Sequence, residues 1–174
     1  MSIAQLTLES LRYRFRGIKK TGDGLLAQVD DDDLNRQINP EVNSIGMIVQ
    51  HLHGNMLSRW TDFLTTDGDK PWRDREGEFE PSVQDKESVL LLWEEGWACT
   101  LASIDALTEE DLTRVITIRG QELGVIDACL RQISHYGYHV GQMVHIGKER
   151  LGDRWQTLSI AKGKSGDYKP GKKD

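Results

Sequence analysis

The segment HYGYHVGQ contains the side chains best placed to do chemistry. It places His135 and His139 four positions apart. On a helix, residues four apart share one face, with Cβ atoms about 6 Å apart, so both imidazoles can bind the same ion. Imidazole nitrogen is a common ligand for divalent transition metals. The spacing therefore indicates a metal site, although two core or surface histidines can also fall at this spacing by chance.

The residues around the two histidines restrict which class of metal site is possible. Zinc peptidases of the His-Glu-x-x-His type need a glutamate as general base directly after the first histidine, and here Tyr136 occupies that position. That class of enzyme is excluded. At about 100° per residue, Gln142 falls on the same stripe as the two histidines, whereas His145 lies about a quarter turn away. We expect His145 to be a surface or interface residue.

A third ligand should come from another helix, and the segment QHLHGN offers His51 and His53. The periodicity of the apolar residues favours His53, because it lies nearer the apolar stripe of that segment. His51 shares a half-polar face with Ser44 and Asn55, and such faces can supply the hydrogen bonds that metal ligands need. Asn55, one turn after His51, could provide one. These arguments leave both histidines open.

Apolar periodicity predicts four long helices that would position these side chains. The helices are expected to run from Ile3 to Leu26, from Asn43 or Ser44 to about Leu64, from Ser82 to about Leu107, and from about Glu122 to Leu151 before Gly152. In the last helix a second, more apolar stripe through Ile126, Leu130, Ile133, Val140 and Val144 indicates that the helix is embedded on two sides. Joined by long connections and followed by a short tail, the elements predict an all-α, four-helix bundle.

The connections differ in character. The acidic run Asp30–Asp33 is expected to be a solvated loop. Residues 65–81 are too rich in glycine, proline and charge for a helix, yet long enough to be structured or functional. Within them Trp72 either packs as a loop anchor or covers the metal as part of a lid. The segment VITIRG, residues 115–120, alternates as a short strand or extended connection does.

Length and charge exclude other classes. With 174 residues we expect one domain spanning residues 1–174, with about 160–174 as a flexible or packed tail. The 28 acidic residues outnumber the 22 basic ones, for a net charge of −6, which disfavours nucleic-acid binding. The sequence has no unbroken apolar stretch of the kind that forms a signal peptide or a membrane span. Cys99 and Cys129 lack the spacing of a redox or zinc motif and indicate core filling, so a cytoplasmic location is expected.

Two segments resemble the DinB-like superfamily, which includes damage-inducible proteins and bacillithiol-transferase-like metalloenzymes, and within it a bacterial family of unknown function. They are NPEVNSIGMIVQHLHGN, with the residues that follow it, and RQISHYGYHVGQMVHIGK; the ending WQTLSIAKGKS is also similar. In that resemblance the histidine eight residues after Asn43 is the first metal ligand, and the His-x3-His pair supplies the other two. The resemblance thus implies His51, His135 and His139 as ligands, with His53 as second choice.

The resemblance also implies a four-helix bundle of the DinB-like type, often a homodimer, with a nickel or zinc ion on the three histidines. Relatives that have been characterised include thiol-dependent enzymes, namely bacillithiol and mycothiol S-transferases and a maleylpyruvate isomerase. The expected partners are therefore a low-molecular-weight thiol and a small electrophile, with no nucleic acid and no membrane. Substrate and reaction are not implied.

Three neutral imidazoles leave at least one coordination position open, as in catalytic zinc sites. Such an ion lowers the pKa of bound water to about 7 or holds a thiol as thiolate. The sequence thus favours an enzyme that activates a thiol or water against a small electrophile. The alternative is a non-catalytic metal-binding stress or interaction protein, because no general base is evident. Asp62, Glu94 and Glu95 are expected to be surface carboxylates.

Overall fold

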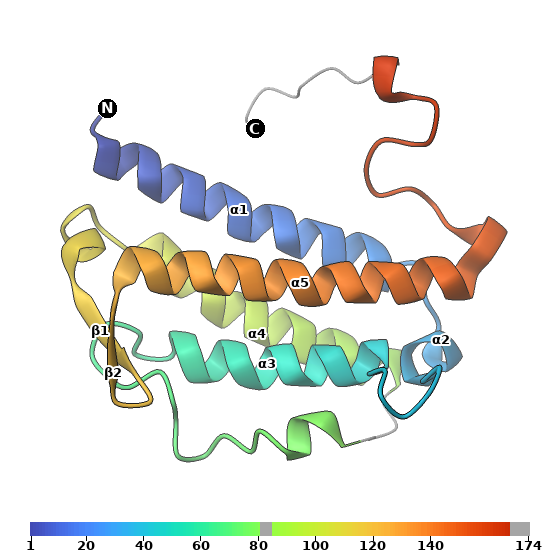
Figure 1. Ribbon diagram of the computed structural model, residues 1–174, viewed down its shortest axis with the longest axis horizontal. Helices are drawn as coiled ribbons and strands as arrows, with labels where there is room; N and C mark the ends of the chain where they lie inside the picture. The colour runs from blue at the N-terminus through green and yellow to red at the C-terminus, as the bar shows by residue number, and fades with distance from the viewer. Residues whose placement is uncertain (81–84, 168–174) are drawn as a thin grey trace.

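Four long helices enclose one core in the computed structural model, which describes residues 1–80 and 85–167 (Figure 1). These are α1 (Ile3–Leu26), α3 (Ile45–Trp60), α4 (Lys86–Ala106) and α5 (Val125–Leu151). In Figure 1, α5 runs between α1 and α3, with α4 behind. Each long helix packs against two others, α1 and α3 each contacting both α4 and α5. The fold is mostly helical.

Short polar residues begin three of the long helices. The side chain of Ser2 accepts a hydrogen bond from the Gln5 amide, Ser44 from the Met47 amide at 3.2 Å, and Asp85 from the Ser88 amide at 2.7 Å. Each bond satisfies a backbone donor that the first helical turn leaves free. The predicted start of the histidine-bearing helix at Ser44 is confirmed.

Two predicted helix ends are shifted. The helix with His51 and His53 ends at Trp60 rather than Leu64, because Thr61 is extended and Asp62 has a positive φ of 51°. The third long helix was expected from Ser82, a position outside the described residues, and the described helix begins at Lys86. The predicted stop at Gly152 is confirmed, since this glycine adopts a φ of 51° after α5.

A β-hairpin precedes α5 and corrects its predicted start. Strand β1 (Val115–Ile118) pairs antiparallel with β2 (Gln121–Gly124), with Ile118 opposite Gln121. Asp67 stabilises the turn between the strands, because its carboxylate accepts hydrogen bonds from the backbone amides of the two turn residues, Arg119 and Gly120. The strand predicted in VITIRG is confirmed. A helix start at Glu122 is wrong, because that residue pairs with β1.

The acidic run is not a solvated loop. It forms the short helix α2 (Asp31–Asn35), in which Asp30 and Asp33 cap the helix start reciprocally. Asp33 is only 1% exposed and accepts a hydrogen bond from Arg150 of α5 at 3.1 Å. Carboxylates stabilise a helix N-terminus, and the buried one is compensated by the guanidinium. The loop prediction is therefore wrong.

The prediction of core filling is confirmed for Cys129, whereas the second apolar stripe of α5 is only partly covered. Trp93, Trp97 and Cys129 are buried, and Cys99 is half-buried. On the outer face of α5, however, Ile126 and Leu130 are 38% and 53% exposed and border a groove beside α1. The helix is embedded along part of that stripe only, because α1 covers its flank incompletely.

After α5 the chain continues through η3 (Gly152–Arg154) and η4 (Ser165–Asp167). Trp155 and Leu158 pack against the core, while residues 168–174 of the tail predicted to be flexible or packed lie outside the described residues. Among the helices that the structure describes, none combines the length and apolarity needed to cross a membrane.

Two glycines of α1 test the packing of this fold. A Cβ at Gly22 would collide with the Trp93 indole, whereas a Cβ at Gly17 meets nothing. We expect Gly22→Ala to lower the free energy of unfolding by about 1–3 kcal/mol through overpacking. Gly17→Ala should raise it by about 0.5–1 kcal/mol, because alanine favours helix. Urea unfolding of both variants measures the difference, and a Gly22→Ala protein as stable as wild type would contradict this packing.

Candidate metal centre

Helices α3 and α5 bring His51, His135 and His139 together. Their ligand atoms all lie within 4.8 Å of one another. The Nε2 atom of His135 is 3.3 Å from that of His51 and 3.2 Å from that of His139. His51 and His139 are buried, with exposed fractions of 8% and 9%, and His135 is half-buried. The three residues selected from the sequence therefore form one cluster.

The spacing of these atoms fits a metal ion. Zinc–nitrogen bonds of about 2.0–2.1 Å in tetrahedral geometry place two nitrogens about 3.3 Å apart. The surroundings allow the tautomers that a metal ion needs, because Nδ1 of His51 and of His139 each faces an oxygen to which it can donate its hydrogen. Nε2 of both rings then presents a lone pair to the same point. The donor set is suited to one divalent cation.

His53, the alternative ligand, points elsewhere. Its Nε2 lies 2.8 Å from the Glu95 carboxylate of α4, and it does not belong to the histidine cluster. The main chain of His53 also lies against Gly96, where α3 and α4 pack closely. The apolar periodicity that favoured His53 thus identified the α4-facing side of the helix, whereas the half-polar face identified the cluster.

The loop after α3 supplies a hydrogen-bond partner for His51 that sequence reasoning missed. Nδ1 of His51 donates to Glu78 Oε2 at 2.9 Å, and Arg73 donates to both oxygens of Glu78 at 2.7 and 2.8 Å. The Glu78 and Arg73 side chains are 7% and 1% exposed. Asn55, predicted for this role, instead accepts a bond from the Tyr136 hydroxyl. That prediction is wrong, because Asn55 faces the core.

Gly54 makes room for the Glu78 carboxylate. A Cβ at this position would collide with Oε1 of Glu78. Glycine in the interior of a helix is unfavourable by roughly 0.5–1 kcal/mol relative to alanine, so its place between His51 and Asn55 needs a reason. A glycine three residues after the ligand histidine, on the same face of the helix, is the sequence signal that could have indicated a close approach from another segment.

The loop is structured around this site, as its length suggested. It contains the short helix η1 (Gly77–Phe79), and the Phe79 ring stacks on His51 with centroids 4.6 Å apart. Trp72 is 57% exposed, so its prediction as a packed anchor is wrong. Phe79, rather than Trp72, is the aromatic residue of this loop that contacts a candidate ligand.

His139 is oriented from within its own helix. Its Nδ1 donates to Gln142 Oε1 at 3.0 Å, and Gln142 Nε2 donates to the Tyr138 hydroxyl at 3.1 Å. The shared stripe of His139 and Gln142 predicted from the sequence is thereby confirmed. His145 is exposed and outside the cluster, as expected.

A buried chain of hydrogen bonds joins α3 to α5 beside the ligands. Trp60 Nε1 donates to the Tyr136 hydroxyl at 2.9 Å, and that hydroxyl donates to Asn55 Oδ1 at 3.1 Å. Burial raises the pKa of Tyr136, which keeps the hydroxyl neutral. The residue that replaces the peptidase glutamate therefore has a structural role.

The electrostatics favour neutral imidazoles. Burial, followed by the neighbouring histidines, lowers the pKa of His135 to about 3, and burial followed by His51 lowers that of His139 to about 4. Burial alone would raise the pKa of Glu78, but the hydrogen bonds from Arg73 and His51 lower it. Glu78 is thus an anion at neutral pH, and the unprotonated imidazoles are ready to bind a cation.

The fold and the histidine cluster define a mostly helical protein with a candidate metal centre. The family described as "Protein of unknown function (DUF1572)" matches residues 2–164, so the chain belongs to this family. The predicted membership of a family of unknown function is thereby confirmed, whereas membership of the DinB-like superfamily stays a prediction. No curated protein matches the chain.

Two solved structures share the fold. A conserved protein from Enterococcus faecalis superposes with a TM-score of 0.62 at 18% identity, covering 87% of this chain and 99% of its own. A DinB-like protein from Bacillus cereus superposes with a TM-score of 0.58 at 16% identity, covering 84% of this chain and 91% of its own. At these identities the likeness concerns the fold.

The contribution of Glu78 to the site can be measured. We expect Glu78→Gln to weaken zinc binding by about 10–100-fold, because the uncharged amide orients His51 less strongly and makes it a poorer ligand. Competition with a chromophoric chelator gives the dissociation constant. Glu76→Gln, in the same loop but exposed, is the control and should bind zinc as wild type does. Equal affinity in both variants would contradict the assigned role of Glu78.

The lowered pKa values predict how the metal-free protein responds to acid. His135 and His139 have folded pKa values of about 3 and about 4 against an ordinary value of 6.5. At pH values between the folded and the unfolded pKa, the unfolded chain binds more protons than the folded protein. The stabilisation from the neutral histidines is therefore fully present above pH 6.5 and is lost as the pH falls toward 4. We expect the Tm of chelator-treated protein to fall across this window.

The double variant His135→Gln with His139→Gln should lose less Tm over the same range. Carboxylates titrate mainly near pH 4 and below, so the upper part of the window reports on histidine. Parallel Tm curves for the wild type and the double variant between pH 6.5 and 5 would show that these two imidazoles do not cause the loss.

Proposed function

We propose that His51, His135 and His139 bind one divalent metal ion, nickel or zinc, through Nε2. We further propose that the protein is a metal-dependent enzyme that activates a thiol or water for transfer to, or hydrolysis of, a small electrophile. The observation that carries this proposal is the composition of the cluster. Within residues 1–80 and 85–167 it contains three imidazoles and no carboxylate or cysteine as a fourth ligand. Three protein ligands are typical of catalytic zinc sites.

A metal ion on these residues would supply Lewis acidity, which makes a bound thiol or water nucleophilic at neutral pH. The chain itself would hold that site in three ways. Glu78 and Gln142 accept hydrogen bonds from His51 and His139, burial keeps His135 and His139 unprotonated, and Phe79 covers one face of His51. Because the ligands are neutral, the positive charge of the ion would not be reduced by its ligands.

A non-catalytic metal-binding protein is the second candidate. It is favoured because Glu78, the carboxylate hydrogen-bonded to His51, is also held by Arg73 and is therefore not free to act as a general base. The side chains of Glu94 and Glu95 are 61% and 64% exposed, as predicted for surface carboxylates. The enzyme candidate therefore has no assigned general base, and a measurement of turnover decides between the two candidates.

We also propose that the four long helices form the four-helix bundle of the DinB-like type, which the pairwise helix contacts and the shared fold support. The homodimer, the cytoplasmic location, the thiol and electrophile partners and the single domain over residues 1–174 stay predictions.

The metal proposal is tested on untagged protein by elemental analysis and zinc titration. Wild type should bind about one zinc per chain, and His139→Ala should bind zinc on the order of 100-fold more weakly. Four ligands together contribute about 10–16 kcal/mol in structural sites, so the loss of one ligand is expected to cost roughly a quarter of that free energy. His53→Ala, outside the cluster, is the control. If His139→Ala and His53→Ala bind zinc equally well, the assigned site is wrong.

The enzyme proposal is tested by turnover of 1-chloro-2,4-dinitrobenzene with cysteine, and of p-nitrophenyl acetate with water, using zinc-loaded and nickel-loaded protein. Metal-dependent turnover that is lost in His139→Ala and kept in His53→Ala is expected. Full metal loading without turnover of either compound would favour the non-catalytic candidate.

A further inference from the structure

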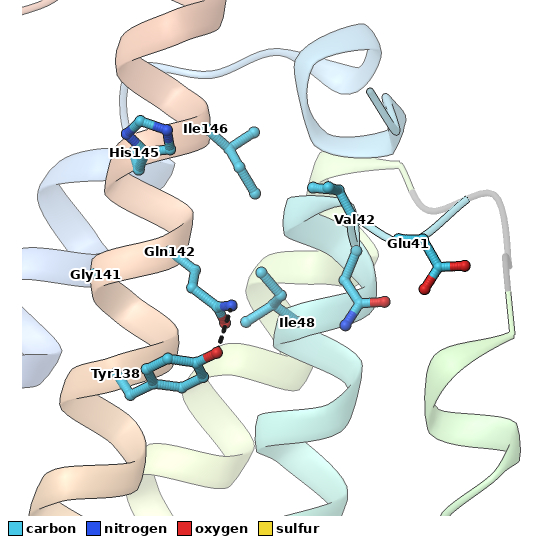
Figure 2. Close-up of a pocket in the computed structure, with 9 residues that line it drawn as sticks. Glu41, Val42, Ile48, Tyr138, Gly141, Gln142, His145 and Ile146 are labelled. Atoms are coloured by element: carbon cyan, nitrogen blue, oxygen red, sulfur yellow. Dashed lines mark hydrogen bonds between the residues drawn. The ribbon is translucent and has the colours of Figure 1, made fainter. Parts of the chain in front are cut away.

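A cleft of about 440 Å³ lies beside the candidate metal centre, between α5 and the start of α3 (Figure 2). Its walls include Tyr138, Gln142 and His145 of α5, Ile48 of α3, and Val42 of the preceding connection. Figure 2 shows Tyr138 and Gln142 joined by a hydrogen bond on the α5 side, with Ile48 across from them. This volume is in the range of small-molecule binding sites, about 300–1,000 Å³.

Gln142 connects this cleft to the histidine cluster. Its Oε1 accepts from Nδ1 of His139 at 3.0 Å, and its Nε2 donates to the Tyr138 hydroxyl at 3.1 Å. One side chain therefore forms part of the cleft wall and also orients a candidate metal ligand. A change on one side of the Gln142 amide can reach the other.

Metal binding would set the direction of these hydrogen bonds. With Nε2 of His139 bound to a cation, Nδ1 must carry the hydrogen and the oxygen of Gln142 must accept it. The amide nitrogen then faces Tyr138, whose oxygen accepts. The Tyr138 hydroxyl hydrogen is left free to be donated, and the side chain is 63% exposed at the cleft.

Without a cation, the hydrogen bonds between His139, Gln142 and Tyr138 can also run in the opposite direction. Neutral His139 can carry its hydrogen on Nε2, the Gln142 amide can turn over and donate to Nδ1, and the amide oxygen can then accept from Tyr138. In that arrangement the Tyr138 hydroxyl hydrogen is used inside the protein. The cleft loses its donor.

We propose that this cleft binds a small molecule that has an aliphatic part and a carbonyl or carboxylate oxygen, and that Tyr138 donates a hydrogen bond to that oxygen. The aliphatic part is matched by Val42, Ile48 and Ile146. Tyr138 and Gln142 are positioning residues, since they hold the ligand and orient His139.

Ligand and metal strengthen each other's binding, because both favour the same direction of the chain from His139 through Gln142 to Tyr138. Such coupling is reciprocal. The coupling rests on the proposed metal site, whereas the cleft itself is a feature of the fold.

The experiment uses isobutyramide as probe, a neutral amide that has an aliphatic group and a carbonyl oxygen. Isobutyramide is titrated into ¹⁵N-labelled, zinc-loaded protein and followed by NMR. Saturable shifts are expected at the Gln142 side-chain amide and at the backbone amides of Tyr138 and Gly141. In metal-free protein the affinity should be about twofold lower if the two amide directions are equally populated.

Two variants test the hydrogen-bond chain itself. Tyr138→Phe should weaken isobutyramide binding by roughly threefold to tenfold, the effect of one hydrogen bond. Gln142→Glu keeps an acceptor for His139 but obliges the Tyr138 hydroxyl to donate to the new carboxylate. It should therefore bind zinc at least as tightly as wild type, yet lose isobutyramide affinity as Tyr138→Phe does. A merely structural Gln142 would not separate the two.

A matched pair of glycine variants tests the cleft. A Cβ meets nothing at Gly141, which lines the cleft, and nothing at Gly137, which is exposed one turn earlier on α5. Gly141→Leu should abolish isobutyramide binding by filling the cleft, and Gly137→Leu should leave it unchanged.

The proposal is overturned if zinc-loaded protein shows no saturable shift, or if wild type, Tyr138→Phe and Gly141→Leu bind isobutyramide equally. Either result leaves the zinc affinity of wild type untouched. Loss of the metal site would instead appear as zinc binding that does not depend on His139, so the two failures are distinguishable.

Discussion

Three buried imidazoles that face one another between α3 and α5 are the constraint on which the rest of this site depends. Nε2 atoms 3.2–3.3 Å apart leave no space for three protons between them, so at least one of the rings must carry its hydrogen on the far nitrogen. The far nitrogens of His51 and His139 are met by Glu78 and Gln142. Burial lowers the pKa of His135 and of His139 and so keeps these two rings neutral. The surrounding polar groups follow from that requirement.

The spacing of the two ligand-bearing helices is maintained by a second set of interactions. The hydroxyl of Tyr136, next to His135 in the chain, bonds to Trp60 and Asn55 of α3. Its ring packs edge-on against Phe15 and Trp97 from the other two long helices. Since cores are densely packed, this aromatic cluster fixes the distance across which the histidines meet. The centre is thus built on rigid elements rather than on loops.

The loop after α3 adds a buried ion pair beside His51. Arg73 and Glu78 form a buried ion pair whose carboxylate reaches His51. A buried pair contributes little net stability, because desolvation opposes the attraction. Its value here is orientation, since Arg73 holds both oxygens of Glu78 and so directs one of them at the imidazole. The loop and the centre are therefore coupled.

Sequence alone determined the features that depend on local periodicity and capping. These include four long helices, the start of α3 at Asn43 or Ser44, the end of α5 at Gly152, and the pairing of His135 with His139 on one face. A four-residue spacing places two side chains without reference to any other segment. The choice of His51 over His53 already needed the family resemblance, because two faces of one helix offered partners.

Tertiary structure decided the features that depend on contacts between distant segments. Glu78 lies 27 residues from His51 along the chain, and only the folded loop brings it to Nδ1. Asn55 was predicted there because local spacing allows it, yet Tyr136 of α5 takes its oxygen. In the same way, pairing with β1 makes residues 121–124 a strand. Long-range hydrogen bonds override local preference, because a buried polar group must find its partner wherever the fold places one.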